Sequence, residues 1–158
     1  MKQQIFASSF LTYNDEMLLM QRGLHKKYAP GMWASIGGHM ESNELNNPIA
    51  TAFREIGEET GVPPSEISDL ELRYITIRHA EDEIRISYYF FGRLNQKPSL
   101  HECDEGALHW VNIKEIQNLP MTYSNKDIIN HWLANPNSTK IFLRAASHDY
   151  TTATWAEL

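Results

Sequence analysis

The sequence predicts an α/β protein in which helices cover a mixed β-sheet. Segments with the apolar alternation of strands outnumber those with helical spacing, and neither kind is confined to one part of the chain. Neighbouring strand segments are joined by short polar turns, such as Asn14-Asp15 and residues 80–83, which suit antiparallel pairing. A chain of 158 residues with 42% hydrophobic content is long enough for one packed domain and too short for two comfortable ones. We therefore expect a single layered domain over residues 1–158.

In the first third of the chain, strand signals cover residues 4–13 and 16–21, which should form a hairpin. The next segment, residues 22–31, is basic and irregular, which indicates a surface loop. A short strand is expected over residues 33–36, and Gly37-Gly38 should end it.

The clearest helix lies between Asn46 and Gly61. Asparagines suited to capping come before Pro48, whose fixed φ favours the first helical position, and Gly61 suits the position just after a helix. The expected buried stripe consists of apolar residues spaced three or four apart, namely Ile49, Ala52, Phe53 and Ile56.

The second half of the chain contains further alternating elements. Two long strands are expected over 70–77 and 84–94, and a third over 107–112. A helical turn near 113–117 and an amphipathic helix over 125–134 should follow, then a late strand over 140–146. The tail after Ser147 has little periodic signal.

The composition argues against several classes of protein. A formal net charge of −6 disfavours a protein that grips polymeric nucleic acid through a basic face. Cys103 is the only cysteine, so the chain has no internal disulfide and no multi-cysteine metal site. The chain also has no apolar run of about 18 residues that would cross a membrane, and its amino terminus is poor signal-peptide material. We expect a cytoplasmic protein that binds a small ligand rather than nucleic acid or membrane.

Three glutamates, Glu55, Glu58 and Glu59, lie on the helix face opposite the apolar stripe. Like charges at this spacing cost an isolated helix roughly 0.2 to 0.5 kcal/mol per pair, and they sit near the negative end of the helix dipole. A divalent cation with oxygen ligands, Mg²⁺ or Mn²⁺, would neutralise them. Arg54 is four residues from Glu58 and could hold the cluster in register. The plainer alternative is a solvated acidic surface, which is the commoner origin of charge runs.

A glycine pair and two more acids precede this helix in the stretch GGHMESNE, which ends at Glu44. Together with REIGEETGV, residues 54–62, it resembles the Nudix hydrolase box of the MutT-like superfamily, G-x5-E-x7-R-E-U-x-E-E-x-G-U, where U is bulky and apolar. Every fixed position of the second half matches. The one departure is a stretch of nine residues instead of seven between Glu44 and Arg54. We expect a longer loop around Asn46-Asn47 to absorb the two extra residues and leave the helix register intact.

The resemblance implies the Nudix fold, an α/β/α sandwich, and the hydrolysis of a nucleoside diphosphate linked to a moiety X. It further implies a Mg²⁺ cofactor, for which Mn²⁺ can substitute, and often a homodimer. Carried over by motif position, Glu58 and Glu59 are metal ligands, Glu55 is a ligand or the base that activates water, Gly38 or Gly37 offers its carbonyl, and Arg54 orients the glutamates.

Residues outside the box are open to two interpretations each. Arg22 matches a position where related enzymes often bind phosphate, or it is an exposed loop charge. Glu105 could be a metal ligand or base, or a plain turn acid. Trp33 could stack on a nucleobase, as could Tyr88 and Phe90, although strand aromatics are more often core. Asn125 could hydrogen-bond a purine edge.

The segment HECDE, residues 101–105, offers nitrogen, sulfur and oxygen atoms for a transition metal. A lone cysteine without a second histidine cluster argues against such a site.

The resemblance leaves the substrate open. The leading expectation is a nucleoside triphosphate or an oxidised purine nucleotide such as 8-oxo-dGTP, cleaved to the nucleoside monophosphate and pyrophosphate. ADP-ribose or another nucleotide sugar is the alternative substrate. A nucleotide-sensing domain without turnover is the alternative of another class.

Overall fold

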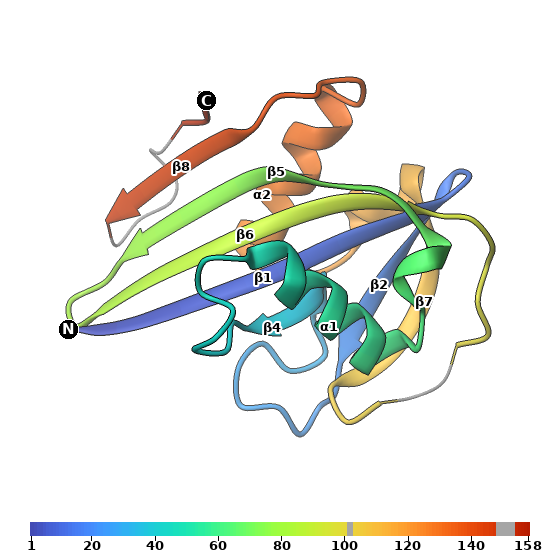
Figure 1. Ribbon diagram of the computed structural model, residues 1–158, viewed down its shortest axis with the longest axis horizontal. Helices are drawn as coiled ribbons and strands as arrows, with labels where there is room; N and C mark the ends of the chain where they lie inside the picture. Colours follow the sequence, from blue (N-terminus) through green and yellow to red (C-terminus); the bar gives the residue numbers. More distant parts are fainter. Residues whose placement is uncertain (101–102, 148–153) are drawn as a thin grey trace.

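The computed structural model describes residues 1–100, 103–147 and 154–158, and in them nine strands form one mixed sheet (Figure 1). The strands are β1 (Lys2–Tyr13), β2 (Glu16–Arg22), β3 (Trp33–Ala34), β4 (Ile36–His39), β5 (Ile67–His79), β6 (Glu83–Leu94), β7 (Gly106–Asn112), β8 (Phe142–Ser147) and β9 (Ala156–Glu157). Their order is β3-β2-β1-β6-β5-β8-β9, with β4 also paired to β1 and β7 to β2. The β1–β6 and β5–β8 pairs are parallel and the others antiparallel, which confirms the predicted mixed sheet.

Helices lie on both faces of this sheet. In Figure 1, α1 (Pro48–Thr60) lies in front of the strands and α2 (Tyr123–Ala134) lies behind them. Two short 3-10 helices, η1 (Pro64–Glu66) and η2 (Ile113–Asn118), are the remaining elements among the described residues. Ala52 and Ile56 of α1 pack into one hydrophobic core, and Ile128 and Ile129 of α2 pack into the other. The α/β/α sandwich is therefore confirmed.

The glycine pair of the predicted short strand has a different role from the one expected. Gly37 and Gly38 do not end a strand but form the middle of β4, paired with Ser8 and Ala7 of β1. A Cβ on Gly37 would lie 2.3 Å from the carbonyl oxygen of Ala7. The glycines therefore allow β4 to lie close against β1, beside the start of the candidate site.

The helix boundaries are close to the prediction, but two details were wrong. Pro48 is the first residue of α1, and Gly61 follows the helix with φ of 74°. Asn47 caps nothing with its side chain, and its N–H donates instead to the carbonyl of Glu44 at 2.7 Å. Ile49 lies outside the apolar stripe because the first turn of the helix is exposed there.

The face of the sheet that carries α2 is only partly covered. Side chains two positions apart on a strand share a face, so Phe10, Tyr74 and Phe91, which pack in the α2 core, mark that face on three neighbouring strands. At the end of the sheet where the amino terminus lies, β1, β5 and β6 extend past α2 (Figure 1). The same sheet face is polar there, with Arg85 on β6 and Arg78 on β5. This uncovered part of the sheet is the floor of the cavity described next.

No helix among the described residues is long and apolar enough to cross a membrane.

Candidate active site

A cavity of about 720 Å³ lies where α1, β4, the start of α2 and the uncovered sheet face meet. Its walls contain the β4 glycine and all four functional residues that the sequence placed on α1, so the motif is assembled at one place. These lining residues are Gly38, Arg54, Glu55, Glu58 and Glu59.

Arg54 contacts several residues of the acidic cluster. Its Nη1 donates to Glu55 Oε1 at 2.9 Å and lies 3.2 Å from Glu58 Oε2, and its Nη2 donates to the His39 carbonyl at 3.0 Å. A guanidinium presents several N–H donors in one plane, so a single arginine can hold several acceptors in fixed positions. Arg54 therefore contacts both glutamates in this structure, and its hydrogen bonds, to Glu44 above all and also to Glu55 and Glu58, raise its pKa.

Glu44 shows how the chain accommodates the two extra residues. Its two carboxylate oxygens accept from Arg54 Nε at 2.9 Å and Nη2 at 3.0 Å. Thr51 Oγ1 donates at 2.7 Å and the Glu41 N–H at 3.0 Å. The hydrogen bonds from Arg54, above all, lower the pKa of Glu44 to about 2. Residues 42–46 form a turn before Pro48, where the longer loop was predicted, and the Glu44 carboxylate in this turn binds Arg54.

Glu59 is a buried acid with an unsatisfied carboxylate oxygen. The residue is 7% exposed, and its Oε2 is buried without a hydrogen-bond partner among the described residues. Burial, followed by the nearby charges of Glu55 and Glu105, raises the pKa of Glu59 to about 8. Burial also raises the pKa of Glu55, against the opposing effect of its hydrogen bond to Arg54. A buried carboxylate with an unsatisfied oxygen beside other acids suits a hard cation.

The donor set fits Mg²⁺ or Mn²⁺ in its chemistry, although no three acidic, histidine or cysteine side chains converge as a finished ligand set in the part of the chain that the structure describes. Arg54 holds Glu55 and Glu58 instead. Gly38 lies directly beside Glu55, because a Cβ there would be 2.5 Å from Glu55 Oε1. The backbone of β4 thus approaches the glutamates closely enough to share a ligand with them.

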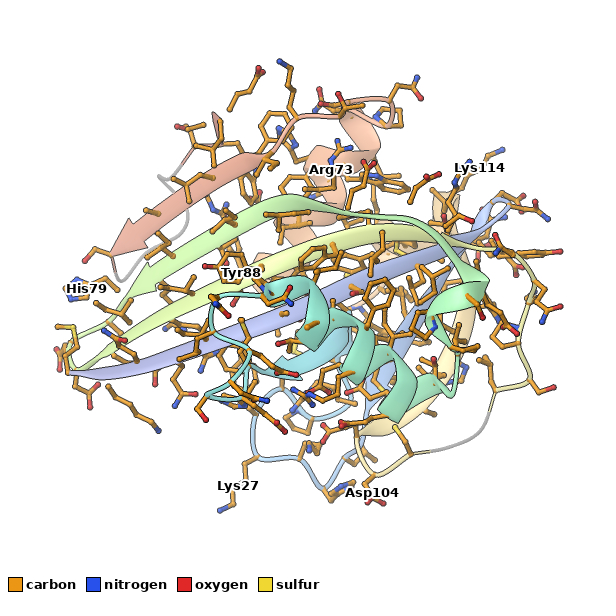
Figure 2. The ribbon with its side chains drawn as sticks, viewed as in Figure 1. Lys27, Arg73, His79, Tyr88, Asp104 and Lys114 are labelled. Atoms are coloured by element: carbon orange, nitrogen blue, oxygen red, sulfur yellow. The ribbon has the colours of Figure 1, made fainter. Side chains whose placement is uncertain are left out.

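Two residues outside the box also reach the cavity. Arg22 lines it, donates from Nε to the Tyr28 carbonyl at 3.0 Å, and lies 5.9 Å from the centre of the Tyr28 ring. Glu105 also lines the cavity and pairs with Lys26 at 2.8 Å. Lys26 belongs to the loop that follows β2, and its neighbour Lys27 points away from the protein (Figure 2). Both predicted residues therefore have positions compatible with their functional interpretations.

The candidate base-binding residues divide between the cavity and the core. Asn125 lines the cavity and is held by Ser35 Oγ at 3.3 Å and Thr122 Oγ1 at 3.1 Å. Trp33 is not among the described residues that line the cavity, and it packs against the His109 ring at 5.0 Å and the α2 core.

Tyr88 and Phe90 were wrong candidates because they face the α1 core, as Figure 2 shows for Tyr88. Side chains alternate along β6, so Tyr89 lines the cavity in their place.

Sequence reasoning missed the polar floor of the cavity, which contains Thr76, Arg78, Arg85 and Ser87. Its signal was present, because polar residues occupy every second position in both ITIR and RIS. This alternation predicts strands, but it does not show that their polar face lines a cavity. His101 and Glu102 of the HECDE segment lie outside the described residues.

Comparisons with known proteins agree with this geometry. The model of the NUDIX domain family matches residues 4–133. An uncharacterized Nudix hydrolase of Bacillus subtilis, YvcI, is 30% identical over 125 residues, which are 76% of this chain and 73% of the relative.

Solved structures share the fold. The MutT protein of Bacillus halodurans superimposes with a TM-score of 0.72 at 24% identity, covering 96% of this chain and 97% of that one. The NUDIX domain of Shewanella oneidensis NrtR, solved with ADP-ribose, has a TM-score of 0.64 at 16% identity, covering 86% and 88%.

Proposed function

Because the chain belongs to the Nudix hydrolase family, whose enzymes hydrolyse pyrophosphate bonds in nucleoside diphosphate derivatives, we propose that it is a Mg²⁺-dependent pyrophosphohydrolase of a nucleoside triphosphate. An oxidised purine nucleotide such as 8-oxo-dGTP is the first candidate, cleaved to the nucleoside monophosphate and pyrophosphate. The observation that carries the proposal is the buried, unsatisfied carboxylate of Glu59 within the cluster that Arg54 organises.

The proposed roles follow from the positions of the side chains. Glu55, Glu58 and Glu59, with the backbone of Gly38, would hold Mg²⁺, or Mn²⁺ in its place. The bound ion would neutralise charge on the diphosphate and polarise the bond to be cleaved. Glu55 and Glu105 are the two candidates for the base that takes a proton from the attacking water. General bases of this kind contribute typically about 10²- to 10⁴-fold to the rate.

The remaining cavity residues would position the nucleotide. Arg22 would offer its guanidinium to phosphate oxygens. Its Nε donates to the Tyr28 carbonyl, so its two Nη groups are the donors that would bind phosphate. Asn125, fixed by Ser35 and Thr122, offers an amide to a purine edge, and the Tyr89 ring lies on the floor. Buried polar groups of this kind discriminate between ligands because a mismatched ligand leaves them without partners.

The alternative substrate, ADP-ribose or another nucleotide sugar, is supported by the NrtR domain solved with ADP-ribose, a likeness that extends to the fold alone. The alternative without turnover is a nucleotide-sensing domain. A cytoplasmic location and a homodimer complete the proposal, and cell fractionation and light scattering test them.

The deciding experiment measures products from a panel of 8-oxo-dGTP, ordinary nucleoside triphosphates, ADP-ribose and dinucleoside polyphosphates. Each substrate is incubated with Mg²⁺ or with EDTA, using the wild type, Glu59→Gln, and Glu66→Gln as a control on η1. Metal-dependent release of nucleoside monophosphate that is lost in Glu59→Gln and kept in Glu66→Gln supports the proposal. Nucleotide binding without turnover on every substrate would favour the sensor instead.

A further inference from the structure

The cavity floor contains two arginines that face each other across neighbouring strands. Arg78 of β5 and Arg85 of β6 are direct partners in the antiparallel register, and both line the cavity. Like charges directly opposite each other in a sheet destabilise it. The next pair on this face, Thr76 and Ser87, is also polar and is buried. Such a floor favours a ligand that brings negative charge to it.

The surroundings of Arg85 hold its guanidinium while leaving donors for a ligand. The group lies 5.0 Å from the centre of the Phe6 ring and 5.8 Å from that of Tyr28. Its Nη2 is 3.2 Å from Glu83 Oε1, whereas its Nε is buried without a hydrogen-bond partner among the described residues. Stacking on aromatic rings fixes the plane of a guanidinium, and its edge then suits the oxygens of a phosphate.

The acids of the cavity all lie on one side, where Arg22, Lys26 and Arg54 also line it. The acids among its described lining residues all belong to α1 or to loops, and they are Glu41, Glu55, Glu58, Glu59 and Glu105. The floor strands β1, β5 and β6 contribute Arg78 and Arg85 and no acid to that lining. From the glycines of β4, one crosses β1 to reach β6 and then β5. Neighbouring strands are about 4.8 Å apart, so the backbone of Arg85 on β6 lies roughly 10 Å from β4 across the sheet, and that of Arg78 on β5 roughly 14 Å.

We propose that Arg78 and Arg85 form a second anion subsite, which binds the terminal phosphate of a nucleoside triphosphate or longer polyphosphate. The inference rests on the proposed function, in which the phosphoryl groups to be cleaved lie beside the α1 glutamates. A terminal phosphate brings oxygen acceptors and negative charge to the arginine pair and can accept from the buried Arg85 Nε, whereas the sugar of a nucleotide sugar brings no charge to it. The pair thereby selects substrates whose moiety X is phosphate.

Calorimetry with inorganic probes tests the subsite without requiring turnover. Tripolyphosphate and pyrophosphate are titrated in the presence of Mg²⁺ into the wild type, Arg85→Gln, Arg78→Gln and the control Arg93→Gln. Arg93 is on β6 too, but its side chain is 70% exposed and pairs with Asp69 away from the cavity. Wild type and control should bind tripolyphosphate about 10- to 100-fold more tightly than pyrophosphate, and either floor variant should lose that difference.

Equal loss of affinity for both probes in Arg85→Gln would overturn the proposal, since it would mean a general role of the arginine. An unchanged preference for tripolyphosphate would overturn it as well. Kinetics provide the second readout, in which the kcat/KM ratio of triphosphate to ADP-ribose should fall by a similar factor, mainly through KM. A wild type that shows the probe preference but hydrolyses nothing would contradict the proposed function and leave the subsite supported.

Discussion

Replacing the buried carboxyl of Glu59 by the amide of glutamine should remove a large part of the pH dependence of stability from the metal-free protein above the acid range. The folded protein favours protonated Glu59, because burial raises its pKa from 4.5 to about 8. Between these values the folded state binds more protons than the unfolded state, so the free energy of unfolding falls as pH rises. The contribution is fully present below pH 4.5 and is lost as pH passes through about 8.

The size of this effect follows from the same two pKa values, 4.5 and about 8. Each pH unit between them costs about 1.4 kcal/mol, so the total loss is at most roughly 5 kcal/mol. Glu44 does not disturb the measurement, because its pKa is lowered to about 2 and its own contribution changes only in more acidic solution. Taking the difference between variant and wild type also cancels the histidines.

Urea unfolding in EDTA at about pH 5.5 and about pH 8.5 measures the effect. The wild type should lose stability between the two, and Glu59→Gln should lose much less. Glu58→Gln is the matched control on the same helix, because the Glu58 side chain is 58% exposed; it should follow the wild type. Parallel pH profiles for wild type and Glu59→Gln would refute the reasoning, since Glu59 would then be ionised in both states.

Three further outcomes are expected. Gly37→Ala should destabilise the protein by about 1 to 3 kcal/mol or more, because its Cβ would meet the β1 backbone, whereas Gly57→Ala should stabilise it by about 0.5 to 1 kcal/mol, because its Cβ meets nothing within 4 Å; thermal unfolding compares them. Arg54→Lys should cost about 1 to 3 kcal/mol and reduce turnover, because the single ammonium nitrogen of a lysine cannot replace the Nε and Nη2 donors that bind the two Glu44 oxygens in one plane; wild-type stability in the variant would contradict this role. Mg²⁺ at about 100 times its Kd should raise the stability of the wild type by about 2.7 kcal/mol and that of Glu59→Gln by clearly less, which a melting series with and without EDTA would show.

Local signals in the sequence were strong enough to locate the elements around the site. The proline and glycine at the two ends of α1 define the helix because each fits its backbone position almost irrespective of context. The motif also correctly predicted that Arg54 and its glutamates lie together. The role of Glu44 could not be predicted from the sequence, because only the folded loop shows that its carboxylate faces Thr51 and Arg54.

The rest of the cavity depended on sheet topology. Whether Tyr88 or Tyr89 faces the cavity is decided by which face α1 covers, and a strand pattern alone does not contain that information. The Arg78–Arg85 pair likewise arises from the register between β5 and β6. Trp33 looked like a stacking residue because its side chain is aromatic, but its ring contacts His109 across β2, the strand that pairs with both β3 and β7.

The central claim is that the α1 glutamates support metal-dependent hydrolysis of a pyrophosphate bond. Its most direct test is kcat/KM for the best triphosphate at saturating Mg²⁺, compared between the wild type, Glu59→Gln and the η1 control Glu66→Gln. A loss of about 10²-fold or more in Glu59→Gln, with the control unchanged, is the expected result. Activity of Glu59→Gln within a few-fold of the wild type would contradict the claim and place the chemistry elsewhere in the cavity.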